Sequence, residues 1–186
     1  TVGYMKDENR FVVVSQSLRE HTTRAMLDGQ IHDINKVAET IAEIKRELEG
    51  NINNKLTDAC IAAAGRVLKT ITVKVDYEFS QETTINIEHI RSLELLGVEK
   101  AYETIREQTY SSKVNFYCVG YTVVKYYLND LPLMSLEGHK ANMISTELIA
   151  TFLPDDVIDG LYSAVDRADL NVANLTLEPI AAINIA

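Results

Sequence analysis

The hydrophobic pattern first predicts a helix in the N-terminal third of the chain. Apolar residues recur at spacings of three and four, which places them on one stripe of an amphipathic helix. The stripe consists of Ile34, Val37, Ile41, Ile44 and Leu48. Asp33 suits the N-cap position, and Gly50 suits the residue that ends the helix.

Two β-rich runs flank this helix. Residues 10–15 form a β-branched run that predicts a strand. Residues 56–64 form a mostly apolar run closed by Gly65, and this pattern predicts a strand buried on both faces.

The middle of the chain predicts a separate α+β layer. Residues 70–79 alternate strictly between apolar and polar, which indicates a strand with one wet face. A helix is expected at residues 88–107, where Gly97 marks a place at which it can break. Two strands follow at 113–128 and 142–153, the first bent at Gly120. Such an order of strand, helix, strand and strand can bury one sheet face under one helix.

The C-terminal part predicts a helix, a strand and a second helix. Asp155 opens the first helix, which we expect to extend to about Ala168. Residues 175–177 end a strand, and Glu178 and Pro179 then begin a helix whose remaining residues are almost all apolar. Glu178 therefore falls at the carboxyl end of a strand and the positive end of a helix, where ligands of open α/β sheets bind.

The sequence around Glu178 resembles a stretch found in the actin-like ATPase superfamily. L-T-L-E-P-I-A-A is similar to L-E-P-L-A-S of FtsA-like cell-division proteins and to N-E-P-T-A-A of DnaK-type chaperones. The resemblance implies that Glu178 orients the water and metal shell at the ATP γ-phosphate, and that Pro179 acts as a conformational switch. A plain strand–turn–helix with an N-terminal acid is the alternative.

The resemblance extends along most of the chain. Gly65-Arg66 matches the place where FtsA-like proteins interrupt their first subdomain, and the module that follows is similar to the inserted part of FtsA and of the pilus protein PilM. The implied fold is α/β plus α+β. Residues 1–66 and 154–186 would be a partial actin-like (ribonuclease H-like) ATPase subdomain, and 67–153 an inserted module. Asp169 departs from the family pattern, which has glycine there.

The phosphate loops of that superfamily are absent from this sequence. Its eight glycines form no glycine-rich loop that could cradle phosphate. The resemblance places the first loop before Thr1 and the second after Ala186, so we expect a fragment. The intact protein would bind ATP and magnesium, and the fragment alone would hold neither and would be catalytically inactive.

Composition narrows the class of partner. The net charge is −9, from 18 basic and 27 acidic residues, which argues against nucleic acid. No run of 18 apolar residues is present, so we expect no transmembrane segment and a cytoplasmic location, with membrane association only through parts outside this sequence. Cys60 and Cys118 lie in apolar runs and are expected to be buried free thiols. The four histidines show no metal-ligand spacing.

Five of the nine tyrosines lie in or near one predicted strand. Tyr117, Tyr121 and Tyr127 share parity and are expected to line one sheet face. They either pack in the core or form a contact surface, since aromatic residues are enriched at protein interfaces. In FtsA-like proteins the inserted module meets partner proteins or the next protomer, so the resemblance implies protein partners or self-assembly.

The function implied by the resemblance is that of an FtsA-like, ATP-binding cytoskeletal scaffold in cell division. One alternative is a DnaK-like chaperone or reactivase. A second alternative is a protein-interaction module with no role in nucleotide binding.

Overall fold

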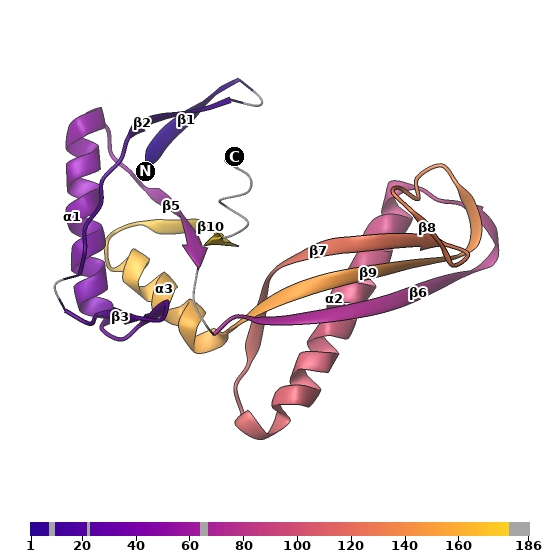
Figure 1. Cartoon of the computed structure of the whole chain (residues 1–186). Coiled ribbons are helices and arrows are strands. Elements are labelled where there is room, and N and C mark those ends of the chain that lie inside the picture. Colours follow the sequence, from indigo (N-terminus) through magenta and orange to yellow (C-terminus); the bar gives the residue numbers. More distant parts are fainter. Residues whose placement is uncertain (8–9, 22, 64–66, 179–186) are drawn as a thin grey trace. The chain divides into compact units, whose positions relative to one another are not determined.

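The computed structural model describes residues 1–7, 10–21, 23–63 and 67–178, and it contains two compact units. Unit 1 comprises Thr1–Val67 and Asp156–Ala186, and unit 2 comprises Leu68–Asp155. Unit 2 is thus inserted into the sequence of unit 1 (Figure 1).

Unit 1 is a mixed α/β structure built from small sheets and two helices. Two antiparallel hairpins lie in its N-terminal half, and a parallel strand pair joins its two halves. Its elements are β1 (Val2–Asp7), β2 (Arg10–Ser15), β3 (Met26–Leu27), β4 (Gln30–Ile31), α1 (Ile34–Ile52), β5 (Asp58–Ala63), α3 (Asp155–Asp166) and β10 (Asn171–Leu177).

Helix α1 begins where the sequence predicts and ends later. The Asp33 side chain accepts a hydrogen bond from the Lys36 amide at 3.1 Å, which confirms the N-cap. Gly50 lies within the helix, so its assignment as the terminating residue is wrong. Asn53 instead takes the left-handed conformation, with φ 52°, because a short polar side chain tolerates that region.

Strand β5 is not buried on both faces, contrary to the sequence pattern. Its paired neighbour is β10, in parallel, and its residues alternate between more and less exposed positions. Cys60 is exposed, so the expectation of a buried thiol is wrong for that residue. Cys118 is half-buried, and burial raises the pKa of its thiol. Both cysteines are free.

Unit 2 is one antiparallel sheet with a long helix on one face (Figure 1). Strand order across the sheet is β6-β9-β7-β8. The elements are β6 (Lys69–Thr84), α2 (Ile87–Thr109), a short 3₁₀ helix (Tyr110–Ser112), β7 (Phe116–Leu128), β8 (Leu131–Leu133) and β9 (Lys140–Pro154). Asn129 and Asp130, with φ of 45° and 68°, form the two-residue turn between β7 and β8.

The core of unit 2 lies between α2 and the sheet. Leu93, Ala101 and Ile105 of the helix and Leu148 and Phe152 of β9 are at most 1% exposed. Helix α2 continues through Gly97 without a break. A Cβ at that position would lie 2.3 Å from Leu148 Cδ2, so glycine is what lets the helix approach the sheet.

Candidate functional site

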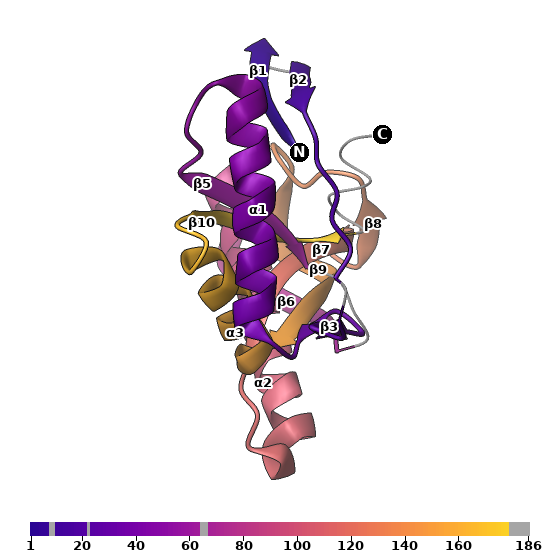
Figure 2. The ribbon, with the colours of Figure 1, turned by 90° about the vertical axis from the view of Figure 1, so that its left-hand side faces the viewer.

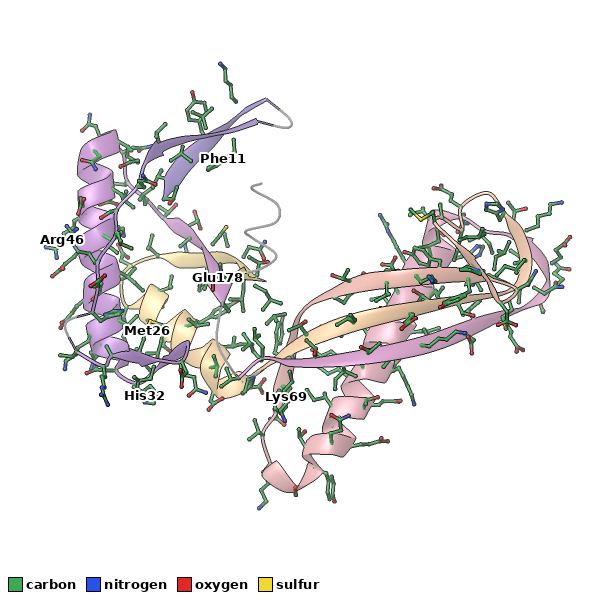
Figure 3. The ribbon with its side chains drawn as sticks, viewed as in Figure 1. Phe11, Met26, His32, Arg46, Lys69 and Glu178 are labelled. Atoms are coloured by element: carbon green, nitrogen blue, oxygen red, sulfur yellow. The ribbon has the colours of Figure 1, made fainter. Side chains whose placement is uncertain are left out.

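The candidate nucleotide site is the carboxyl edge of the parallel pair β5 and β10. Leu177 pairs with Ala63, so the last residues of the two strands lie side by side. Glu178 follows as the first helical residue, with an exposed side chain at the end of β10 (Figure 3). Its carboxylate thus lies at the sheet edge where ligands of α/β proteins bind. Pro179, the apolar stretch after it and Gly65-Arg66 lie outside the described residues.

The loop that leads into β10 is held by the end of α3. Helix α3 ends at Asp166, earlier than predicted, and the Leu170 amide donates to the Val165 carbonyl at 3.3 Å. Asp169 has φ 59°, the left-handed conformation that glycine favours at this kind of helix end. The aspartate therefore adopts the geometry that a glycine in its place would adopt.

Lys45 of α1 caps this same turn. Its Nζ donates to the Asp169 carbonyl at 2.6 Å and lies 3.3 Å from the Asp169 carboxylate, while its side chain is only 12% exposed. A cation at a helix C-terminus is stabilised by the helix dipole. The contact ties α1, which lies in front of β5 in Figure 2, to the segment that positions β10 and Glu178.

An apolar cavity of about 390 Å³ lies between α1, β5 and α3. His21 lines it, and its Nδ1 is 3.3 Å from the Thr40 hydroxyl. None of the described residues that line it carries a carboxylate, so these residues offer mainly apolar contact. In the part of the chain that the structure describes, no three His, Cys, Asp or Glu side chains gather as metal ligands do.

The three predicted tyrosines do not share one face of the unit 2 sheet. Tyr117 pairs with Leu153 and Tyr127 with Ser145, on the face away from α2, whereas Tyr121 pairs with Ala150 on the helix face. The prediction is wrong for Tyr121 because β7 has irregularities between 118 and 120 and between 123 and 125. Each bulge adds a residue and reverses the parity that follows.

On the helix face, Glu94 of α2 accepts hydrogen bonds from two tyrosines of β7. The Tyr121 hydroxyl donates at 2.8 Å, and the Tyr126 hydroxyl donates to the other carboxylate oxygen. The bond to Glu94 raises the pKa of Tyr121. Burial, followed by the same carboxylate, raises the pKa of Tyr126. These two hydrogen bonds join α2 to β7. The sequence gives no signal for them, because the partners lie about thirty residues apart along the chain.

The opposite face of the sheet is open and carries charges in register. Lys74 of β6 and Lys125 of β7 each pair with Glu147 of the central strand β9. The Lys74 ammonium lies 4.5 Å from the ring centroid of Tyr127, whose hydroxyl is 3.4 Å from the Glu147 carboxylate. Alternation in β6 places Lys74 on the wet face, but only the sheet register shows that the two lysines flank one carboxylate.

Comparison with known proteins adds a structural relationship. No protein-family model matches the sequence, and no curated protein does. The fold is shared with part of the solved PilM-PilN type IV pilus biogenesis complex. The TM-score is 0.53 at 12% sequence identity.

The similarity covers 89% of this chain, which is more than either unit could supply alone. It therefore includes residues of both the mixed α/β unit and the inserted α+β unit. The chain spans 40% of the length of the matched PilM-PilN chain. Unit 1 and unit 2 together are consistent with a partial actin-like fold.

The PilM-PilN similarity does not single out FtsA among actin-like proteins. At this level of identity it concerns the fold, and it leaves the roles of Glu178 and of the tyrosines as predictions. No described helix combines the length and apolar character needed to cross a bilayer.

Proposed function

We propose that this chain is part of an actin-like, ATP-binding protein that serves as a scaffold for a protein assembly. The observation that carries the proposal is the fold shared with the PilM-PilN complex over both units. The position of unit 2, inserted between β5 and α3 of a mixed α/β unit, supports the same assignment.

Within this proposal, Glu178 belongs to the nucleotide site of the intact protein. Bound Mg²⁺-ATP would supply the reactive γ-phosphate. Binding of the phosphates would also require several groups besides this one carboxylate. The exposed Glu178 side chain at the carboxyl edge of β5 and β10 is suited to orient water around the metal. Pro179 would act as the switch that transmits the nucleotide state to the residues that follow it.

Unit 2 would provide contacts to partner proteins. Tyr117, 55% exposed, lies on its open face with Tyr127, and aromatic side chains are favoured at interfaces. The Tyr121 hydroxyl donates a hydrogen bond to Glu94, but the side chain is still 41% exposed. Tyr121 therefore stays a candidate for contact with a partner protein, on the face of the sheet that carries α2.

Two cellular settings follow from the scaffold proposal. The Glu-Pro stretch favours an FtsA-like role in cell division, and the similarity to a pilus biogenesis complex favours a role in pilus assembly. Disruption of the gene should distinguish them, because loss of a divisome scaffold gives filamentous cells and loss of a pilus scaffold gives cells without pili. A DnaK-like chaperone would instead be recognised by nucleotide-dependent binding of unfolded polypeptide.

Binding of Mg²⁺-ATP to the full-length protein tests the nucleotide role. We expect magnesium-dependent binding by calorimetry, and the variant Glu178→Gln should lower ATP turnover by about 100- to 1,000-fold, the range seen when a group that stabilises a transition state is removed. Asp159→Asn, an exposed acid on α3, is the matched control and should leave binding and turnover unchanged. Absence of magnesium-dependent ATP binding in the full-length protein would favour the non-nucleotide interaction module.

A further inference from the structure

Strand β6 offers a long, regular sheet edge. One side of β6 pairs with β9, with an unbroken register from Lys69 to Glu78. On its other side, no strand of the described chain pairs with it. Such an edge exposes a row of backbone N–H and C=O groups, which favours pairing with another strand.

The side chains of β6 are self-complementary in one antiparallel register. We propose that two copies of this chain pair β6 with β6 about a two-fold axis through Val75. Lys74 of each copy then lies opposite Asp76 of the other, and Thr72 lies opposite Glu78. Opposite charges directly across an antiparallel pair stabilise it. The pairing does not depend on nucleotide binding and extends the proposed scaffold role to a second copy of the chain.

The neighbouring registers are disfavoured by charge. Directly opposed residues must share a sheet face, so the two-fold axis has to pass through a residue. An axis through Lys74 places two lysines opposite each other, and an axis through Asp76 places two aspartates opposite each other. Like charges in direct opposition destabilise a strand pair. An axis through Val75 avoids both arrangements.

The helix face of unit 2 is compatible with the same axis. Val75 faces α2, and the position of a Cβ on Gly97 would lie 3.6 Å from Val75 Cγ2, so this part of α2 covers β6 at the residue where the proposed pairing is centred. Leu96, beside Gly97, is 38% exposed. In the helical repeat, Leu96 falls on the same flank as His89, which makes an edge-to-face contact with Phe79 of β6. The Leu96 side chains of two copies would therefore face each other.

The proposed pairing places both helices on one face of the continuous sheet. Helix α2 lies over β6 and β9. Because the two-fold axis is normal to the sheet, the two helices would run antiparallel to each other on that face. The result would be a continuous sheet in which two copies of β6 are the central strands.

A charge-exchange experiment on the full chain tests the pairing. Sedimentation velocity at increasing protein concentration should show a monomer–dimer equilibrium. Lys74→Asp and Asp76→Lys should each weaken the dimer by about tenfold or more, because each creates two like-charge oppositions. The double variant restores opposite charges and should restore dimerisation.

Lys125→Asp is the matched control for Lys74→Asp. Both place a new carboxylate opposite Glu147, but Lys125 lies on β7, away from the β6 edge. We expect this control to dimerise like the unaltered chain. Circular dichroism of every variant checks that unit 2 remains folded.

Cross-linking tests the register itself. In a Cys60→Ser background, a Thr72→Cys protein mixed with a Glu78→Cys protein should form a disulfide-linked dimer on mild oxidation. Neither protein alone should do so, since like positions would be separated by six residues, about 20 Å.

Three results would overturn the proposal. The first is that the chain stays monomeric at all concentrations. The second is that the Lys74→Asp and Asp76→Lys variants are folded and dimerise as strongly as the unaltered chain. The third is that each cysteine variant cross-links with itself instead of with the other.

Discussion

Gly97 controls how closely α2 approaches the sheet. It lies inside a helix, where glycine costs roughly 1 kcal/mol relative to alanine. Leu148, whose atoms would collide with a Cβ at that position, is fully buried in the core of unit 2. The close approach therefore outweighs the helix propensity at this residue.

We expect Gly97→Ala to destabilise unit 2 by about 1–3 kcal/mol, the usual cost of overpacking a core. Gly50→Ala is the control, because Gly50 is also helical and a Cβ there would meet nothing within 4 Å. This control should stabilise the chain by up to about 1 kcal/mol. Urea unfolding of both variants provides the measurement, and equal effects would contradict the packing argument.

The Tyr126–Glu94 contact should make stability depend on pH in the alkaline range. The pKa of Tyr126 is raised in the folded state, so above about pH 10 the unfolded chain releases a proton that the folded chain retains. The free energy of unfolding should therefore fall as pH rises above 10. Tyr126→Phe should make this fall less steep, as measured by urea unfolding between pH 8 and 11. Glu94→Gln should act in the same direction, and an unchanged slope in Tyr126→Phe would contradict the assignment.

At the scale of elements, the end of α3 shows that an aspartate can adopt a backbone conformation that usually favours glycine. Asp169 adopts a left-handed conformation that costs an ordinary residue roughly 1–2 kcal/mol. Its main chain is fixed by Lys45, which donates to its carbonyl. Its own side chain is fully exposed, so the ion pair with Lys45 contributes little.

Asp169→Gly should consequently stabilise the chain by about 0.5–1 kcal/mol, because glycine takes this conformation without strain. Asp159→Gly, in the interior of α3 and likewise exposed, should destabilise it by about 1 kcal/mol. Thermal unfolding distinguishes the two variants. Destabilisation by Asp169→Gly would mean that the carboxylate matters more than the backbone conformation.

At the scale of the whole molecule, unit 2 has the features of an independent folding unit. Its two hydrophobic clusters draw only on its own residues. Lys69, where β6 begins, pairs with Phe152 near the end of β9, so the chain enters and leaves unit 2 on adjacent strands. Insertion at such a point needs no change in the fold of the inserted unit.

Residues 68–155 expressed alone should therefore fold and unfold cooperatively in urea. Residues 1–67 alone are the control and should not, because β5 then lacks β10, its parallel partner. Circular dichroism and urea titration measure both fragments. A non-cooperative transition for residues 68–155 would show that unit 2 depends on unit 1.

The sequence by itself determined the local elements whose signals lie within a few residues. The N-cap at Asp33 and the alternation along β6 are examples, because each depends on the type or spacing of nearby residues. Strand β1 had no comparable signal. Its short sequence mixes apolar and charged residues, and it is a strand because it pairs with β2.

Only the tertiary structure decided which residues meet. Two bulges in β7 place Tyr121 on the helix face and leave Tyr117 and Tyr127 on the other, although all three have the same parity in sequence. The exposure of Cys60 and the lack of space for a side chain at Gly97 likewise depend on residues that are distant in the sequence. The physical reason is that periodicity is a local property of the backbone. Register and close packing are instead set by partners far away along the chain.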